Sequence, residues 1–163
     1  MRLLAGGVAI VATAHMGQRS GLTATAICSL AMSPPRILAC VNVGGYTYDQ
    51  ISRSRCMSIN ILAEVQQAIA DRFAGRVRVE DCEERFSGAD WDSGITGAPL
   101  LVDALVALDC TITQMFVLDT HAILVGQVEQ ASFGVQRPPL VHFDAGFMNR
   151  SLPIAPAPSP VYA

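Results

Sequence analysis

The sequence predicts a mainly β protein, built as a closed or half-closed antiparallel barrel with one main helix. Two neighbouring stretches, residues 104–118 and 120–133, carry apolar side chains at mostly alternate positions, which is the period of a half-buried strand. Residues 64–74 combine helical apolar spacing with a glycine placed to end a helix. Closing long strands into a barrel would remove exposed sheet edges. The chain has no regular alternation of strands and helices and no G-x-G-x-x-G or phosphate-loop motif, so a doubly wound fold is not expected.

The shorter elements come from local patterns along the chain. Apolar runs predict further strands at residues 8–14, 36–43, 57–62 and 140–143, and residues 46–53 predict a short helix. Pro34 and Pro35 force an extended entry into the second of these strands. In the main helix, the spacing predicts that Val65, Ile69 and Phe73 form the buried face.

The chain divides into one domain at residues 1–150 and a proline-rich tail at residues 151–163. The length of 163 residues suits a single domain with a sizeable core. Pro153, Pro156, Pro158 and Pro160 keep the tail out of helix and sheet, so we expect it to be extended.

The composition indicates a partner subunit and argues against two other partners. Hydrophobic residues make up 51% of the chain and charged residues only 15%, which predicts that a second subunit covers part of the surface. No run reaches the roughly 18 apolar residues needed to cross a bilayer. The net charge is −3 and no basic cluster is present, which argues against a nucleic-acid partner.

The cysteines predict a reducing, cytoplasmic environment. They are odd in number, widely spaced and contain no C-x-x-C pair: Cys28, Cys40, Cys56, Cys82 and Cys110. The three histidines lie far from any cysteine in the sequence, so no metal site is expected.

The first residues allow two interpretations. An early positive charge at Arg2, an apolar run and the small residues Ala12 and Ala14 are typical of a cleaved secretory leader. The same residues also fit the first strand of a cytoplasmic domain.

Five segments, in order, resemble the flavin reductase-like family, the FMN-binding split barrel proteins. They read GLTATAICSLAMSPPRILACVN, INILAEVQQAIADRFAG, ERFSGADWDSGITGAPLLVDALVALDC, THAILVGQVE and PLVHFDAGF, and they lie between residues 21 and 147. The resemblance as a whole, with the residues before the first segment, covers residues 2–147. The resemblance implies an antiparallel split β-barrel of Greek-key type with a few flanking helices. It also implies that residues 3–6 end a helix in which Met1 already lies and that residues 8–13 form the first barrel strand, which excludes the secretory leader.

The resemblance further implies an NAD(P)H:flavin oxidoreductase, the reductase component of a two-component flavin-dependent monooxygenase. Such a protein binds FMN or FAD, accepts a hydride from NADH or NADPH and releases reduced flavin to a separate oxygenase; the cofactors carry the chemistry and the protein positions them. We expect a homodimer with the flavin near the subunit boundary. Two alternatives stay open, namely a flavin-dependent reductase of corrinoid cobalt in the same family and a flavin-binding protein without turnover.

The resemblance also implies the site residues. His121, at the start of the fourth segment, is expected to orient the nicotinamide or to donate to the flavin edge, and is the catalytic candidate. The alternative for His121 is a core or interface residue. Thr23, Thr25 and Ser29 are expected to hold the flavin phosphate, or merely to pack a tight strand. The cofactor-binding candidates are Thr23, Ala24, Thr25, Ala26, Ser29, Leu30, Asn42, Gly44, Gly45, Thr47, Phe73, Arg85, His142, Phe143 and Gly146.

Two positions depart from the family pattern. Ala31 stands where a second Ser or Thr is common, and Val43 stands where an arginine would contact phosphate. We expect backbone N–H groups at Gly44 and Gly45 to replace that arginine by forming an anion-binding nest.

Overall fold

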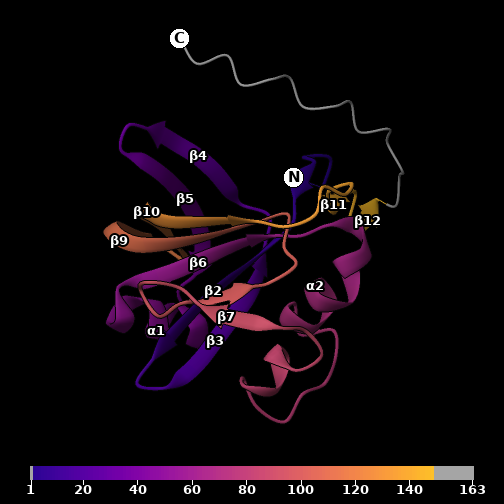
Figure 1. Ribbon diagram of the computed structural model, residues 1–163, viewed down its shortest axis with the longest axis horizontal. Helices are drawn as coiled ribbons and strands as arrows, with labels where there is room; N and C mark the ends of the chain where they lie inside the picture. Colours follow the sequence, from indigo (N-terminus) through magenta and orange to yellow (C-terminus); the bar gives the residue numbers. More distant parts are fainter. Residues whose placement is uncertain (1, 149–163) are drawn as a thin grey trace.

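The computed structural model describes residues 2–148. Their main feature is a seven-stranded antiparallel sheet with the order β3-β2-β6-β9-β10-β5-β4 (Figure 1). Its strands are β2 (Ala9–His15), β3 (Gln18–Ala24), β4 (Ile27–Met32), β5 (Pro35–Asn42), β6 (Cys56–Ile61), β9 (Val106–Leu118) and β10 (His121–Phe133). The two longest strands, β9 and β10, lie in the two stretches for which the alternating pattern predicted strands. They form a hairpin, and Asp119 in its turn has φ 51°.

The sheet is curved into a split barrel, which confirms the predicted fold class. Its two outermost strands, β3 and β4, are consecutive in the chain and are separated only by Thr25 and Ala26. Beyond this corner, the β4–β5 hairpin diverges from β2 and β3 (Figure 1). The main apolar core fills the inside of the curve and takes buried residues from β2, β5, β6, β9 and β10.

Smaller elements cover the ends of this sheet. Strands β1 (Gly6–Gly7), β11 (Val141–Phe143) and β12 (Gly146–Met148) form one small sheet, and β7 (Trp91–Ser93) pairs with β8 (Pro99–Leu101). The helices are α1 (Tyr46–Ser54) and α2 (Gln67–Phe73), with short 3₁₀ turns η1 (Glu64–Gln66) and η2 (Glu84–Phe86). A second core cluster lies between α2, β8 and the start of β2.

Two expectations about local structure are wrong. Residues 3–6 do not end a helix, because the chain turns at residues 2–3 and Gly6 then pairs with His142 in β1 and β11. The main helix begins with the 3₁₀ turn η1, whose tighter winding changes which side chains face the core. Val65 is therefore 64% exposed, and Ala70 is buried beside Phe73 instead.

Asp109 also departs from the pattern of its strand. The alternation in β9 predicts a polar, solvent-facing position, yet Asp109 is fully buried. The turn between β7 and β8 covers it: the Thr96 backbone N–H donates to Asp109 Oδ2 at 2.7 Å, and the Thr96 hydroxyl bonds to Oδ1. The two hydrogen bonds from Thr96 thus offset the desolvation cost of burying this carboxylate.

Helix α2 packs on β3 at a position that requires glycine. A Cβ on Gly21 would lie 2.8 Å from Cε1 of Phe73. The Thr23 hydroxyl donates to the Ala70 carbonyl at 2.7 Å and fixes the helix to the same strand. The Phe73 ring also contacts the rings of Phe86 and Trp91, with centroids 5.0 and 5.6 Å away. The predicted helix end at Gly75 is present, with φ 74°. The predicted proline-rich tail at residues 151–163 lies outside the described residues.

Candidate functional site

A cavity of about 390 Å³ lies at the corner where β3 leads into β4, and we call it the corner cavity. It collects seven of the predicted site residues from β3, the corner, β5, α2 and β10. Its lining residues are Leu22, Thr23, Ala24, Thr25, Ala26, Cys40, Val41, Asn42, Phe73, Ala74 and His121.

His121 and Asn42 lie side by side at one end of the corner cavity. His121 is the first residue of β10, directly after the β9–β10 turn, and it pairs with Asn42 at the end of β5. Its Nδ1 lies 2.9 Å from the Thr120 hydroxyl. When Nδ1 accepts that hydroxyl hydrogen, Nε2 carries the ring proton and is a hydrogen-bond donor. The strand register therefore gives the cavity an exposed imidazole beside an amide side chain.

The two threonines of the cavity are not equivalent. Thr23 donates its hydroxyl hydrogen to the Ala70 carbonyl, so this hydrogen is already used in holding α2. Thr25 is exposed, and no hydrogen bond of its hydroxyl is formed within residues 2–148. Thr25 is consequently the better placed of the two to donate to a ligand.

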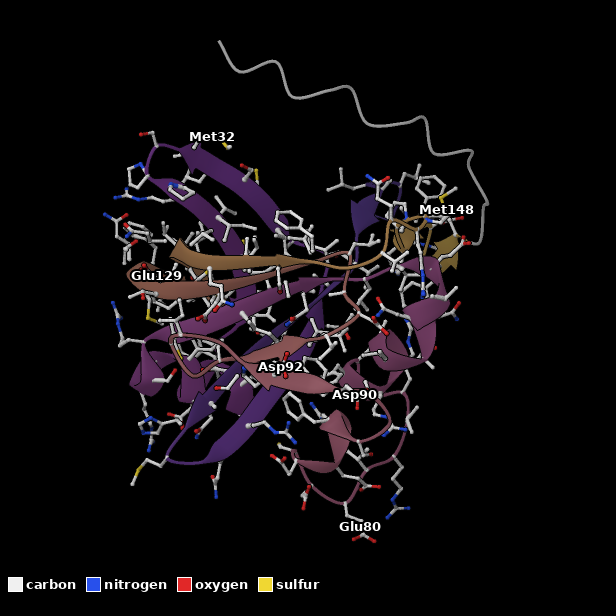
Figure 2. All side chains as sticks on the ribbon, viewed as in Figure 1. Met32, Glu80, Asp90, Asp92, Glu129 and Met148 are labelled. Carbon is white, nitrogen blue, oxygen red and sulfur yellow. The ribbon has the colours of Figure 1, made fainter. Side chains whose placement is uncertain are left out.

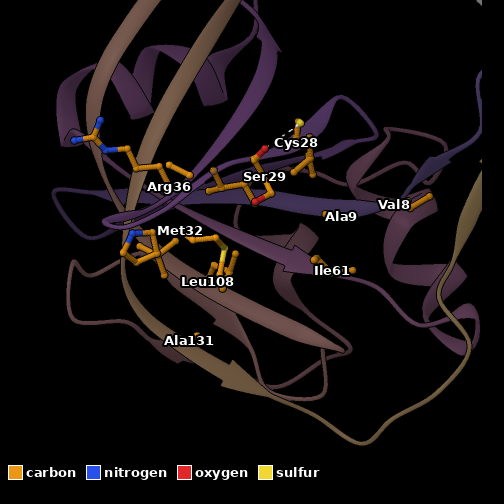
Figure 3. Close-up of a pocket in the computed structure, with 15 residues that line it drawn as sticks. Val8, Ala9, Cys28, Ser29, Met32, Arg36, Ile61, Leu108 and Ala131 are labelled. Atoms are coloured by element: carbon orange, nitrogen blue, oxygen red, sulfur yellow. Dashed lines mark hydrogen bonds between the residues drawn. The ribbon is translucent and has the colours of Figure 1, made fainter. Parts of the chain in front are cut away.

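A second cavity, of about 570 Å³, lies between the β4–β5 hairpin and the strands that diverge from it (Figure 3). We call it the apolar cavity, because most of its lining is aliphatic. Figure 3 shows Val8, Cys28, Ser29, Met32 and Arg36 among its lining residues. Ser29 thus lines a different cavity from Thr23 and Thr25, and the structure does not bring the three predicted phosphate ligands together.

Several predicted cofactor contacts are occupied by the fold itself. Thr47 is buried in α1, and its hydroxyl lies 2.8 Å from that of Ser20. The N–H of Gly44 donates to Asn42 Oδ1 at 2.8 Å, and the N–H of Gly45 donates to the Asn42 carbonyl. The expected anion-binding nest at Gly44 and Gly45 is therefore wrong for this conformation, because both donors are already used.

Other predicted residues lie outside both cavities. Leu30 is 49% exposed in a bulge of β4. Arg85 extends toward β3, where its guanidinium donates to the Gly21 carbonyl at 3.3 Å. His142, Phe143 and Gly146 belong to β11 and β12. This small sheet borders the apolar cavity only through Gly7, which pairs with Val141.

Cys40 lines the corner cavity and Arg36 lines the apolar cavity, although the sequence predicts only a buried apolar strand for both residues. The signal for Cys40 was its spacing, because Cys40 and Asn42 are two residues apart on β5 and share a face. Arg36 had no such signal, since its surroundings depend on the path of β4.

The described residues contain no disulfide, no metal-binding group and no membrane-spanning helix. All five cysteines are free, with Cys28 exposed and Cys56 and Cys110 buried. Within residues 2–148, no group of His, Cys, Asp or Glu is arranged to hold a metal ion. In the same part of the chain, no helix has the length and apolar character to span a bilayer.

Comparison with known proteins gives the family. Residues 1–151 match the model of the flavin reductase like domain. FMN reductase (NADH) RutF from Pseudomonas syringae pv. syringae (strain B728a) is 38% identical over 125 residues, covering 77% of this chain and 68% of the relative. The Escherichia coli (strain K12) protein of that name is 33% identical over 147 residues, covering 90% of this chain and 88% of the relative.

Solved structures agree with this assignment. A putative flavin reductase from Haemophilus somnus 129PT superposes with a TM-score of 0.85 and 34% identity, covering 91% of this chain and 93% of that one. BorF, the flavin reductase component of a bacterial two-component tryptophan halogenase, superposes with a TM-score of 0.83 and 29% identity, covering 94% of each chain. The chain belongs to the flavin reductase like domain family.

The cysteine environments predict a large difference in thiol reactivity. Burial, with the negative charges of Asp109 and Glu129 adding to it, raises the pKa of Cys110 from 9.0 to about 12. A raised thiol pKa means less thiolate at a given pH, and the thiolate is the reactive form. At pH values below 9, iodoacetamide should therefore label Cys28 rapidly in the native protein and leave Cys110 unmodified, as read by peptide mass spectrometry. The unreduced, denatured protein should show all five thiols. Labelling of native Cys110 as fast as Cys28, or fewer than five thiols, would contradict this assignment.

Proposed function

We propose that this chain is an NADH-dependent flavin reductase that reduces FMN and supplies it to a separate oxygenase. The observation that carries the proposal is that a member of this family gathers Thr25, Asn42, Phe73 and His121 around one cavity. The names of its relatives support the same chemistry: the RutF proteins are FMN reductases that use NADH. BorF supports the partner oxygenase, as the reductase half of a two-component system. FAD is the second candidate flavin, since a Streptomyces globisporus NADH:FAD oxidoreductase superposes with a TM-score of 0.84 at 26% identity.

The corner cavity suits a flavin in size and in the chemistry of its lining. Its volume of about 390 Å³ lies within the usual range for cofactor sites. Thr25 and the Asn42 amide offer hydrogen-bond donors, while Phe73, Val41 and Leu22 form an apolar wall. A bound flavin would supply the hydride-accepting ring system. The task of the chain is to hold that ring and the nicotinamide in contact and to keep water out.

In this proposal His121 positions the reactants. Its imidazole is exposed in the lining of the corner cavity and is hydrogen-bonded to Thr120, so Nε2 is available to a polar atom of the nicotinamide or of the flavin edge. Asn42 stands next to it, with its Oδ1 already accepting the Gly44 N–H and its amide N–H groups directed by that bond. Both side chains are held before substrate arrives, which lowers the entropic cost of productive binding.

Replacement of His121 tests the proposed function and the site together. We expect His121→Ala to lower kcat/KM for NADH by about ten- to a hundredfold, or about 1.4–2.7 kcal/mol of transition-state stabilisation. The FMN dissociation constant should change much less, because Thr25 and Asn42 stay in place. The assay follows the loss of NADH absorbance with FMN or FAD, and NADPH is compared in parallel.

The matched control is His15→Ala, at the far end of β2. This variant should oxidise NADH at the rate of the unmodified protein. No NADH oxidation by the unmodified protein with either flavin would refute the proposed function. Normal catalysis by His121→Ala with a lower melting temperature would show that His121 is a packing residue.

We further propose a homodimer in which a second copy covers the apolar cavity. The support lies in β4, which is a terminal strand of the sheet and leaves its unpaired edge beside this cavity. Leu30 and Met32 on β4 are 49% and 83% exposed. Figure 2 shows Met32 at the end of the hairpin. An exposed apolar edge strand next to an apolar cavity is costly in water and is usually covered.

Charges introduced on β4 should break this dimer. We expect the unmodified protein to sediment as a dimer at micromolar concentration and the Leu30→Glu, Met32→Glu double variant as a monomer. Met16→Glu is the control, because Met16 is 89% exposed in the turn between β2 and β3. A monomeric unmodified protein, or a double variant that stays dimeric, would overturn the proposal.

A cytoplasmic location is supported by the cysteines. All five are free, and exported chains of this size more often use cysteines in disulfides. The absence of nucleic-acid and membrane partners stays a prediction from charge and composition.

A further inference from the structure

We propose that this protein has a second binding site, for one small oxyanion such as inorganic phosphate or sulfate, on the side of α2 away from the corner cavity. The site is a small pocket of about 50 Å³. We call it the arginine pocket, and its lining residues are Ala68, Ile69, Arg72, Arg85, Ser87, Gly88, Ala89 and Trp91.

The first observation is a pair of buried donors without acceptors. Arg85 Nε and Trp91 Nε1 are both shielded from solvent, and neither makes a hydrogen bond within residues 2–148. Both belong to side chains that line the arginine pocket. A buried N–H group without an acceptor costs about 1–3 kcal/mol, so two on one small pocket indicate that an acceptor belongs there.

The second observation is an excess of positive charge. Arg72 and Arg85 both line the pocket, and neither has a carboxylate within 4 Å in the described part of the chain. Their guanidinium groups are instead held by neutral acceptors. Arg72 donates to the Ser87 carbonyl at 2.7 Å and to its hydroxyl at 2.6 Å, and Arg85 donates to the Gly21 carbonyl. These bonds fix the two cations in position without neutralising them.

Three carboxylates close to Arg72 and Arg85 in the sequence are engaged elsewhere. Asp71 pairs with Arg76 at 2.8 Å, and Glu83 pairs with Arg19. Glu84 Oε2 accepts the backbone N–H of Glu80 at 2.6 Å. None of these groups is free to turn toward Arg72 or Arg85 without losing its own partner. An external anion is therefore the group that would balance the two charges.

Size and surroundings restrict the ligand to a small ion. A volume of about 50 Å³ matches one small anion. The adjoining cavity shares Ile69, Gly88 and Ala89 with the arginine pocket, and its charged lining residues are Asp90, Asp103 and Arg137. A nucleotide extending from the arginine pocket would place its further phosphates in this lining of net negative charge, which disfavours it. Planar guanidinium groups match the oxygens of phosphate and sulfate.

The arginine pocket is separate from the corner cavity. The two share no lining residue, and the ring of Phe73 lies between them, contacting Trp91 on one side and lining the corner cavity on the other. An anion held by Trp91 and Arg85 would therefore steady the aromatic group behind Phe73 without touching a ligand in the corner cavity.

Trp91 is the only tryptophan in the chain, so its fluorescence reports directly on this pocket. The experiment titrates the full-length protein with potassium phosphate, and separately with potassium sulfate, at an ionic strength held constant with potassium chloride. We expect a saturable change in emission and a rise in melting temperature that follows the same binding curve. In Arg72→Gln and Arg85→Gln, the dissociation constant should rise by about ten- to a hundredfold, as expected for a lost charge-assisted hydrogen bond.

Two further variants keep the test decisive. Trp91→Phe keeps an aromatic ring but removes the N–H. The dissociation constant obtained from its melting-temperature titration should rise by about fivefold. Arg53→Gln is the control, because Arg53 is exposed on α1 and pairs with Asp49. It should behave like the unmodified protein.

Three results would overturn the proposal. The first is the absence of a saturable response to either oxyanion. The second is an equal thermal shift in Arg72→Gln, Trp91→Phe and Arg53→Gln, which would be a general salt effect. The third is competition with phosphate by FMN but not by riboflavin, which would place the phosphate of the flavin in the arginine pocket.

Discussion

The contact between Gly21 and Phe73 is the constraint on which the functional end of the molecule depends. The Phe73 ring occupies the space that a Cβ on Gly21 would need, and this close approach brings α2 onto β3. The bond from Thr23 to the Ala70 carbonyl holds the helix in the same position. Phe73 then serves as a wall of the corner cavity on one side and as part of an aromatic cluster with Phe86 and Trp91 on the other. The absence of a side chain at Gly21 thus sets the position of α2 and, through Phe73, the positions of the corner cavity and the arginine pocket.

The split of the barrel produces two different surfaces, a polar one at the corner between β3 and β4 and an apolar one along the β4–β5 hairpin. Near the corner at Thr25 and Ala26, the strands are close and their edges carry polar groups, which suits a polar cofactor held by donors. Farther along, the β4–β5 hairpin leaves the other strands and exposes an apolar cavity next to an unpaired strand edge. Hydrogen-bond donors favour a flavin at the first place, and uncovered apolar area favours a second subunit at the second.

Much of the fold could be predicted because its signals are local. The alternation in β9 and β10, the small helix α1 and the turn at Asp119 all depend on residues within a few positions of one another. Asp109 and Val65 were misjudged because their burial depends on a distant loop and on a 3₁₀ turn. At the site, the resemblance located the segments, but sequence could not show which donors the fold would use. Thr47, Gly44 and Gly45 have the right chemistry for a ligand and are already bonded within the protein.

A crystal structure of the protein with FMN bound is the most direct test of this account. We predict that the flavin occupies the corner cavity, contacts Thr25 and Asn42 and lies against His121, with Phe73 unchanged in position. A flavin bound entirely within the apolar cavity, among Val8, Cys28 and Arg36 and away from His121, would contradict it.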